Sequence, residues 1–304
     1  MKRDFLQLAD LTATERKSLL ARARSLKERR ARGVVDTTLA GKTLALIFEK
    51  PSTRTKLSFE AAMTQLGGGV LSVSATESQL SRGETLADTA KVVSRYADAI
   101  VFRTFGEARL RELAAAATVP VINGLSDEAH PVQLLADLLT IEEHVGKIAG
   151  AKVAFVGDGT SNMALSWIEA AGLFDFSLHI GAPQKFSPAI ARVSSNVKLF
   201  ESPEDAARDV DVVATDVWTS MGQEAESAER VRVLMPYQVN AKLVALAAPK
   251  AIVLHCLPAH RGEEITDDVV DGAQSVVFDE AENRMHAQKA LLEILLVAPT
   301  DSSR

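Results

Sequence analysis

The chain is poor in cysteine and has no excess of positive charge. One cysteine among 304 residues excludes a disulfide within the chain and gives little material for a structural zinc site, which needs about four Cys or His ligands. Lysine and arginine number 34 against 40 for aspartate and glutamate, a net charge of -6. The chain therefore lacks the basic surface that neutralises nucleic-acid phosphates, and we expect neither a nucleic-acid partner nor a bound metal.

The sequence also has no long hydrophobic run. No apolar segment approaches the roughly 20 residues that span a bilayer, and Lys2 and Arg3 are followed by Asp4 rather than by the apolar core of a signal peptide. Hydrophobic residues make up 47% of the chain and charged residues 24%, as in soluble globular proteins. These features predict a cytoplasmic protein without a membrane partner.

Short apolar segments alternate with helical patterns along the whole chain, which predicts an α/β fold. The expected strands are Leu44–Phe48, Val70–Val73, Ala99–Arg103, Pro120–Ile122, Lys152–Val156, Ser177–Ile180, Val212–Ala214, Ile252–Cys256 and Val276–Phe278. The expected helices include one that begins with the capping box Thr12–Glu15 and ends at Gly33, then Thr55–Gln65, Glu84–Tyr96, Gly106–Ala117, Pro131–Glu143 and a final one from about Glu280 to Leu296.

The length of the chain favours two domains of about 150 residues each. Gly146 and Gly150 mark the expected boundary. We predict domains 1–145 and 146–279, each a parallel sheet flanked by helices, with a C-terminal helix (about 280–304) that packs back on the first. Because open α/β sheets bind ligands at the carboxyl ends of their strands, we expect the active site in the cleft between the domains.

A polar octet, residues 48–55 (FEKPSTRT), follows the first expected strand. Ser52, Thr53, Arg54 and Thr55 lie where that strand gives way to a helix, so backbone N–H groups, hydroxyls and a forked guanidinium meet at one point. This arrangement suits a phosphate-like anion. The alternative is that the hydroxyls only cap the helix.

A second motif, His130-Pro-Val-Gln133, opens a helix, because proline suits the first helical position. A neutral imidazole there would polarise a carbonyl group by donating a hydrogen bond to it. The alternative is that His130 merely caps its helix.

Two further motifs follow strands in the second half of the chain. Asp216-Val-Trp-Thr-Ser220-Met221-Gly222 offers a carboxylate and a hydroxyl that suit an ammonium group, although an ordinary acidic loop is equally possible. The motif His255-Cys256-Leu257-Pro258 places a thiol at a strand end, which indicates a nucleophile, a metal ligand or a buried, inert cysteine.

The glycine turn Gly157-Asp158-Gly159 imitates a dinucleotide-binding loop, but position 162 is asparagine instead of the third glycine. We expect no dinucleotide cofactor, and no other cofactor is indicated.

Together these motifs resemble the aspartate/ornithine carbamoyltransferase family over nearly the whole chain, including residues 278–284 (FDEAENR). The resemblance implies carbamoyl transfer from carbamoyl phosphate to the δ-amine of L-ornithine, giving L-citrulline and phosphate, in arginine biosynthesis. The same site serves synthesis and breakdown, so the direction stays open.

The acceptor is the open question within this family. The aspartate branch carries proline where Cys256 stands and lacks the Ser-Met-Gly loop. N-acetylornithine, N-succinylornithine and putrescine are further possible acceptors, and a non-catalytic relative that binds carbamoyl phosphate or ornithine is possible too. Asp216 favours ornithine, because a free α-amine needs a carboxylate partner.

The resemblance also implies roles for individual residues. The catalytic residues are Arg103, His130, Cys256 and Arg284. Carbamoyl phosphate is bound by Ser52, Thr53, Arg54, Thr55, Gln79, Arg103, His130, Gln133, Cys256, Leu257 and Arg284. Ornithine is bound by Asn162, Asp216, Ser220, Met221, Cys256 and Leu257. Members of the family are typically trimers with active sites shared between subunits, so we expect a homotrimer or a multiple of it in which Gln79 reaches a neighbouring active site.

The implied chemistry is direct attack of the deprotonated δ-amine on the carbonyl carbon, through a tetrahedral intermediate. Arg103, His130, Thr55 and Arg284 would face the developing oxyanion, and Cys256 would orient the amine without a covalent step. The sequence departs from the family at Ser161 and Leu165, where asparagine is usual. These departures weaken the ornithine-site inference without removing it, since Asn162 is present.

Overall fold

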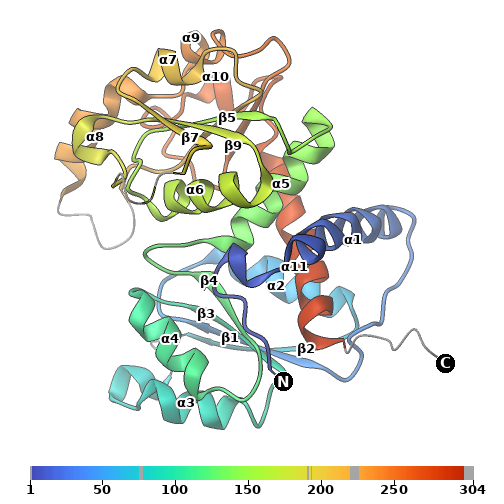
Figure 1. The fold of residues 1–304 in the computed structure, drawn as a ribbon. Coiled ribbons are helices and arrows are strands. Elements are labelled where there is room, and N and C mark those ends of the chain that lie inside the picture. The colour runs from blue at the N-terminus through green and yellow to red at the C-terminus, as the bar shows by residue number, and fades with distance from the viewer. Residues whose placement is uncertain (1, 75–77, 190–191, 193, 220–225, 298–304) are drawn as a thin grey trace. The chain divides into compact units, whose positions relative to one another are not determined.

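Two parallel β-sheets organise the chain in the computed structural model, which describes residues 2–74, 78–189, 192, 194–219 and 226–297 (Figure 1). The first sheet has the strand order β2-β1-β3-β4 and the second β7-β6-β5-β8-β9, and every pairing between neighbouring strands is parallel. The α/β class predicted from the sequence is confirmed.

The strands are β1 (Thr43–Phe48), β2 (Gly69–Ser74), β3 (Ala99–Arg103), β4 (Val121–Leu125), β5 (Lys152–Val156), β6 (Ser177–Gly181), β7 (Val197–Phe200), β8 (Val212–Thr215) and β9 (Ile252–His255). The helices are α1 (Ala13–Ala31), α2 (Thr53–Gln65), α3 (Leu86–Val93), α4 (Glu107–Ala116), α5 (Pro131–Val145), α6 (Asn162–Phe174), α7 (Pro203–Ala207), α8 (Ser227–Leu234), α9 (Ala241–Val244), α10 (Asp267–Val270) and α11 (Val277–Leu296).

The chain divides into two compact units, each built on one sheet. The first comprises Met1–Leu135 together with the C-terminal segment from Glu282, and the second comprises Ala136–Ala281. The first division falls within α5, earlier in the chain than the Gly146–Gly150 boundary expected from the sequence. The second falls within α11.

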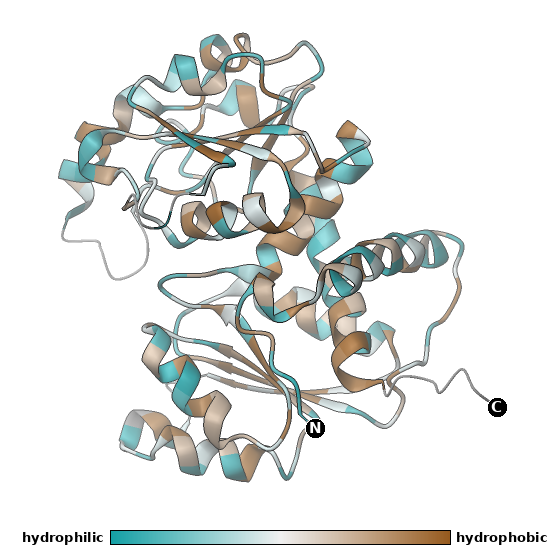
Figure 2. Ribbon diagram, in the orientation of Figure 1, coloured by the Kyte–Doolittle hydropathy of each residue, from teal (hydrophilic) through white to brown (hydrophobic). Residues whose placement is uncertain are grey.

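In the first unit, α3 and α4 cover one face of the sheet. Their apolar side chains form a core with alternate residues of β1 and β3, among them Ile47, Ile100 and Phe102. Side chains alternate across a strand, so these strands can bury their other residues on the opposite face, and β1 and β3 are apolar almost throughout (Figure 2). A strand with two buried faces fits a parallel sheet.

In the second unit, residues of β5, β8 and β9 form a core with α7, α9 and α10. Parallel strands adjacent in one sheet end at the same edge, and these three are neighbours in the order β5-β8-β9. The segments that follow them, at residues 157, 216 and 256, therefore share that edge. This topology brings together motifs that lie far apart in the sequence.

Two local predictions from the sequence have clear outcomes. The capping box at Thr12 is confirmed, because its hydroxyl accepts from the Glu15 amide and the Glu15 carboxylate accepts from the Thr12 amide. The strand expected at Val276–Phe278 is wrong, because α11 begins at Val277. Asp279 and Glu280 occupy its first turn, where the helix dipole favours carboxylates, and this outweighs a short apolar run. Sequence reasoning also missed β7, a short edge strand with only one buried residue.

The buried His286 of α11 makes the stability of the fold sensitive to acid. Burial is the main cause that lowers the pKa of His286 to about 4, against about 6.5 in an unfolded chain. Between these values only the unfolded state binds the proton, so the free energy of unfolding decreases as pH falls from 6.5 to 4. We expect His286→Gln to remove about 3 kcal/mol of that decrease at pH 4.

The measurement is urea unfolding at several values of pH between 7 and 4. His260→Gln is the control, since its side chain is 47% exposed. An equal pH dependence in wild type and His286→Gln would contradict the assignment.

Candidate active site

The polar octet runs from the last residue of β1 through the connecting loop into the first turn of α2. Ser52 occupies the N-cap position of α2, yet its side chain makes no capping hydrogen bond. The interpretation of this hydroxyl as a helix cap is therefore not supported. The first N–H groups of a helix have no partner within the helix, so the loop and the helix start together offer donors to an anion.

Four buried side chains of the first unit come together from different elements. They are Thr55 of α2, Arg103 at the end of β3, His130 directly before α5, and Arg284 of α11. The Arg284 guanidinium donates from Nη2 to Thr55 Oγ1 at 2.7 Å. The charges of Arg284 and Arg103 act on His130, which places all three groups in one region.

The electrostatics of this cluster keep His130 neutral. Burial, followed by the charges of Arg284 and Arg103, lowers the pKa of His130 well below its usual value. A neutral imidazole donates a hydrogen bond from one nitrogen and accepts at the other. The cluster thus combines two fixed positive charges with a neutral donor, which suits a substrate that carries both an anion and a carbonyl group.

Backbone and side-chain contacts fix the loops that carry these groups. The amide of Glu49 donates to Arg103 O at 2.8 Å, which ties the octet to the end of β3. Lys50 forms an ion pair with Asp127 and lies 4.4 Å from the centroid of the Phe105 ring. Sequence reasoning did not single out Lys50, and its position inside the octet was the only available signal.

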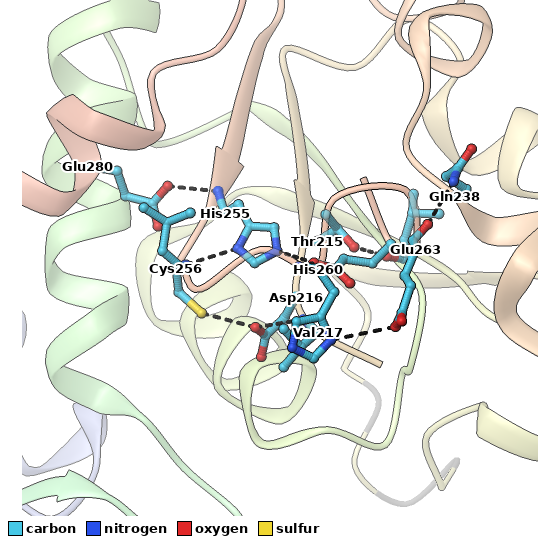
Figure 3. A network of polar contacts seen from close by, with 12 residues as sticks. Thr215, Asp216, Val217, Gln238, His255, Cys256, His260, Glu263 and Glu280 are labelled. Carbon is cyan, nitrogen blue, oxygen red and sulfur yellow. Dashed lines mark hydrogen bonds and ion pairs between the residues drawn. The ribbon is translucent and has the colours of Figure 1, made fainter. Parts of the chain in front are cut away.

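In the second unit, Asp216 and Cys256 lie at the ends of the neighbouring strands β8 and β9 (Figure 3). Cys256 donates from Sγ to Asp216 Oδ1 at 3.1 Å, and the Val217 amide donates to the same oxygen at 2.8 Å. No hydrogen bond to Asp216 Oδ2 occurs among the described residues, so that oxygen can accept from a ligand.

Burial raises the pKa of both Asp216 and Cys256. It is the main cause that raises the pKa of the Asp216 carboxyl, and it raises the pKa of the Cys256 thiol well above its usual value, where the nearby Asp216 charge adds to the effect. The thiol is therefore protonated near neutral pH and acts as a hydrogen-bond donor. A nucleophilic cysteine needs the opposite shift toward thiolate.

A buried network holds the strand end that carries Cys256 (Figure 3). The His255 amide donates to Glu280 Oε2 at 2.8 Å. The imidazole ring of His255 accepts at Nδ1 from the Leu257 amide at 2.9 Å. Its Nε2 lies 3.0 Å from Glu264 Oε1. Because Nδ1 accepts, the proton of the neutral ring lies on Nε2, which donates to Glu264.

Sequence reasoning missed the two carboxylates of this network. Glu264 follows directly after Glu263, and nothing in the sequence distinguishes the buried member of this pair from its neighbour. Glu280 was recognised only as part of a helix start. Both are fully covered by protein, and that burial is visible only in the folded chain.

Within the part of the chain that the structure describes, two groups of side chains have metal-ligand composition. The ligand atoms of Asp216, His255 and Cys256 lie within 4.8 Å of one another, and so do those of His260, Glu263 and Glu264. In the first group both His255 nitrogens already take part in hydrogen bonds and the thiol is protonated. A metal ion there would have to displace a hydrogen bond and a proton.

The turn after β5 carries the remaining described residue of the expected ornithine site, Asn162, which is the first residue of α6. Ser161 caps that helix, since its hydroxyl accepts from the Ala164 amide at 3.2 Å. The departure from the family pattern at Ser161 therefore keeps a good N-cap residue. Ser220 and Met221 lie outside the described residues. Gln79 is exposed and begins the short 3-10 helix Gln79–Arg82.

The first unit gathers residues whose chemistry suits an anion, and the second unit holds a carboxylate–thiol pair whose chemistry suits an amine. Such a combination is typical of a group-transfer enzyme. Comparison with known proteins agrees. Residues 3–143 match the family model "Aspartate/ornithine carbamoyltransferase, carbamoyl-P binding domain", and residues 149–295 match "Aspartate/ornithine carbamoyltransferase, Asp/Orn binding domain". The chain belongs to the aspartate/ornithine carbamoyltransferase family.

Individual relatives are similar over almost the whole chain. An ornithine carbamoyltransferase of Desulfotalea psychrophila is 53% identical over 296 residues, which covers 95% of this chain and 97% of the relative. The solved structure of ornithine carbamoyltransferase from Pyrococcus furiosus is 49% identical, with a TM-score of 0.92 and 97% coverage of both chains. That from Thermus thermophilus is 39% identical, with a TM-score of 0.90 and coverage of 97% and 99%.

Among the described residues, no helix combines the length and the apolar character that crossing a membrane requires.

Proposed function

We propose that the protein transfers the carbamoyl group of carbamoyl phosphate to the δ-amine of L-ornithine and releases L-citrulline and phosphate. The observation that carries this proposal is the hydrogen-bonded Asp216–Cys256 pair at the ends of β8 and β9. It offers a carboxylate to an ammonium group and a protonated thiol to an amine. The names of the relatives, all ornithine carbamoyltransferases, support the same acceptor.

We assign carbamoyl phosphate to residues 1–145 and ornithine to residues 146–279, with the C-terminal helix (about 280–304) belonging to the first domain. The two family models, which match 3–143 and 149–295, support this assignment. In the first domain, Ser52–Thr55 hold the phosphate, with Gln133 and the cluster of Arg103, His130 and Arg284 on the carbamoyl group. In the second, Asn162, Asp216, Ser220 and Met221 hold the α-amino and carboxylate groups, and Cys256 and Leu257 lie beside the δ-amine.

The reaction begins with loss of a proton from the δ-ammonium group, because an ammonium has no lone pair with which to attack. The amine then adds to the carbonyl carbon, and negative charge grows on the carbonyl oxygen. Arg103, Arg284 and the neutral His130 stabilise that charge, and preorganised donors of this kind contribute about 2.7–4 kcal/mol each. As the C–O bond to phosphate breaks, the attacking nitrogen transfers its extra proton to the departing phosphate, which leaves with its charge held at Ser52–Thr55.

A direct assay tests the proposal. The enzyme is given carbamoyl phosphate with ornithine, N-acetylornithine, N-succinylornithine, putrescine or aspartate, and the ureido product and phosphate are both measured. We expect turnover with ornithine and much slower turnover with the other acceptors. An acylated α-nitrogen carries no charge that could pair with Asp216, and putrescine has no α-carboxylate. Absence of turnover with ornithine would refute the proposal.

Cys256→Ser tests the role of the thiol. We expect kcat to fall by roughly tenfold, because the hydroxyl still donates to Asp216 but sits at a different distance from the amine. An orienting contact can be weakened without loss of the reaction, whereas loss of a covalent nucleophile abolishes it. A well-folded but inactive Cys256→Ser enzyme would exclude the orienting role.

We also propose a homotrimer, or a multiple of trimers, in which Gln79 reaches the active site of a neighbouring subunit. Apolar residues on the exposed surface of the first unit support a subunit contact, namely Leu57 of α2 and Leu71 and Val73 of the edge strand β2, which precedes Gln79. Light scattering after size-exclusion chromatography gives the mass directly. A monomer that turns over ornithine at full rate would contradict the shared site.

We place the enzyme in the cytoplasm. The lone cysteine is used as a protonated thiol beside Asp216, a role that a reducing compartment preserves.

A further inference from the structure

Arg230 of α8 is a buried arginine that the mechanism does not use. Counting only described residues, its guanidinium makes three contacts, all within the second unit. Nη2 forms an ion pair with Asp158 Oδ2, Nε donates to the carbonyl oxygen of Trp218 at 2.6 Å, and Cζ lies 4.7 Å from the centroid of the Phe186 ring. Arg230 and Asp158 are 6% and 5% exposed, so the pair is shielded from solvent and the cost of separating its charges is large.

The two polar partners of Arg230 belong to the two segments that we assign to the acceptor. Asp158 lies in the turn after β5, and its Oδ1 accepts from the Thr160 amide at 2.8 Å and from the Thr160 hydroxyl. This turn leads into α6, whose first residue is Asn162. Trp218 lies two residues beyond Asp216, in the segment after β8.

These segments also touch one another directly. Gly157 has a positive φ of 133°, and a Cβ atom built on it would lie 3.2 Å from Trp218 Nε1. The Trp218 indole is fully buried, and its N–H has no hydrogen-bond partner among the described residues. The Thr215 hydroxyl donates to the Val156 carbonyl oxygen at 2.7 Å and joins the two strand ends. Beyond the strand ends, the bond from Arg230 to the Trp218 carbonyl and its ion pair with Asp158 link the segment to the turn.

We propose that Arg230 is a positioning residue of the acceptor site, which sets the spacing between Asn162 and Asp216 by binding the turn after β5 and the segment after β8 at once. This inference rests on the proposed function. The geometry requires arginine, because two nitrogens of one rigid guanidinium act in different directions, whereas a lysine ammonium is a single point of charge.

The test compares wild type with Arg230→Met, Arg230→Lys and Asp158→Asn. We expect Arg230→Met to raise KM for ornithine by roughly tenfold or more and to lower kcat, while KM for carbamoyl phosphate changes by less than about twofold. Arg230→Lys should be intermediate, because it keeps one contact. The double variant Asp158→Asn/Arg230→Met should have the same KM for ornithine as Arg230→Met, since both substitutions break the same ion pair.

Tyr237→Phe is the matched control for general destabilisation. It removes another buried hydrogen bond of the second unit, from the Tyr237 hydroxyl to the Glu201 carbonyl, without touching either segment. We expect it to lower the melting temperature and leave both KM values unchanged. Trp218 also gives a readout besides activity. In a Trp167→Phe background it is the single tryptophan, and Arg230→Met should shift its emission to longer wavelength, whereas Tyr237→Phe should not.

Three results would overturn the proposal: a folded Arg230→Met enzyme with unchanged KM for ornithine, an equal rise in KM for both substrates, or the same rise in Tyr237→Phe. If Arg230→Met does not fold, Arg230→Lys and Asp158→Asn are judged by the same criteria. Failure of wild type to use ornithine would instead refute the proposed function, so the two failures are distinguishable.

Discussion

Arg54→Ala is expected to raise KM for carbamoyl phosphate by roughly 10²-fold or more. Arg54 lies in the first turn of α2, beside the helix N-terminus, and is the one residue of the Ser52–Thr55 loop that carries a full positive charge. A hydrogen bond to a charged group contributes about 1.5–3 kcal/mol, and a guanidinium can make two to a phosphate. The side chain is half-exposed, so its removal should hardly affect folding.

Steady-state kinetics with each substrate varied in turn, together with the affinity for phosphate alone, measure the effect. Lys56→Ala is the control, because it removes an exposed cation two residues further along the same helix. Binding of ornithine to its own domain should be unchanged by either substitution. Unchanged affinity of Arg54→Ala for carbamoyl phosphate would exclude the anion-site interpretation of the octet.

Asp216→Asn is expected to raise KM for ornithine by roughly 10- to 100-fold and to leave KM for carbamoyl phosphate unchanged. Asparagine keeps the shape and can still accept from the Val217 amide and the Cys256 thiol, but it removes the charge that pairs with an ammonium group. Loss of one charged contact of this kind costs about 1.5–3 kcal/mol. Asp211→Asn is the matched control, since Asp211 precedes β8 at its opposite end and accepts from the Lys152 amide at 2.9 Å.

The raised pKa of Asp216 adds a pH dependence to this prediction. As the pH falls through that pKa, the carboxylate becomes protonated and loses its affinity for the ammonium group, so KM for ornithine should rise in acid in the wild type. Asp216→Asn should abolish that rise. The Asp216 charge also helps to raise the pKa of Cys256, and we expect the thiol of Asp216→Asn to react with alkylating reagents at lower pH. Identical pH profiles in the two enzymes would exclude Asp216 as the acceptor's charge partner.

The sequence predicted most of the secondary structure because the relevant signals are local. Runs such as Leu44–Phe48 alternate with helical patterns, and the capping box at Thr12 identifies a helix start within four residues. The errors have the same origin. Val276–Phe278 has the composition of a strand, and only the packing of Val277 in the core and the 64% exposure of Phe278 show that a helix has begun.

The candidate site could be predicted only in part. Motifs that follow strands identified Arg54, His130, Asp216 and Cys256 as residues with chemistry, and family resemblance gave them expected roles. The partners of these residues came from the fold. Thr55 accepts from an arginine 229 positions away, and Glu264, rather than the adjacent Glu263, faces His255.

The sequence by itself determined the alternation of strands and helices, the single thiol, the acidic net charge and the positions of polar motifs after strands. The tertiary structure decided which motifs share an edge of the sheet. It also decided that the Ser52 hydroxyl does not cap α2, and which groups have a pKa away from the usual value. The physical reason is one of range. Propensity and periodicity act over a few residues, whereas the burial of His130 and Asp216 and the contacts of Arg230 depend on strand order and on packing at the scale of single ångströms.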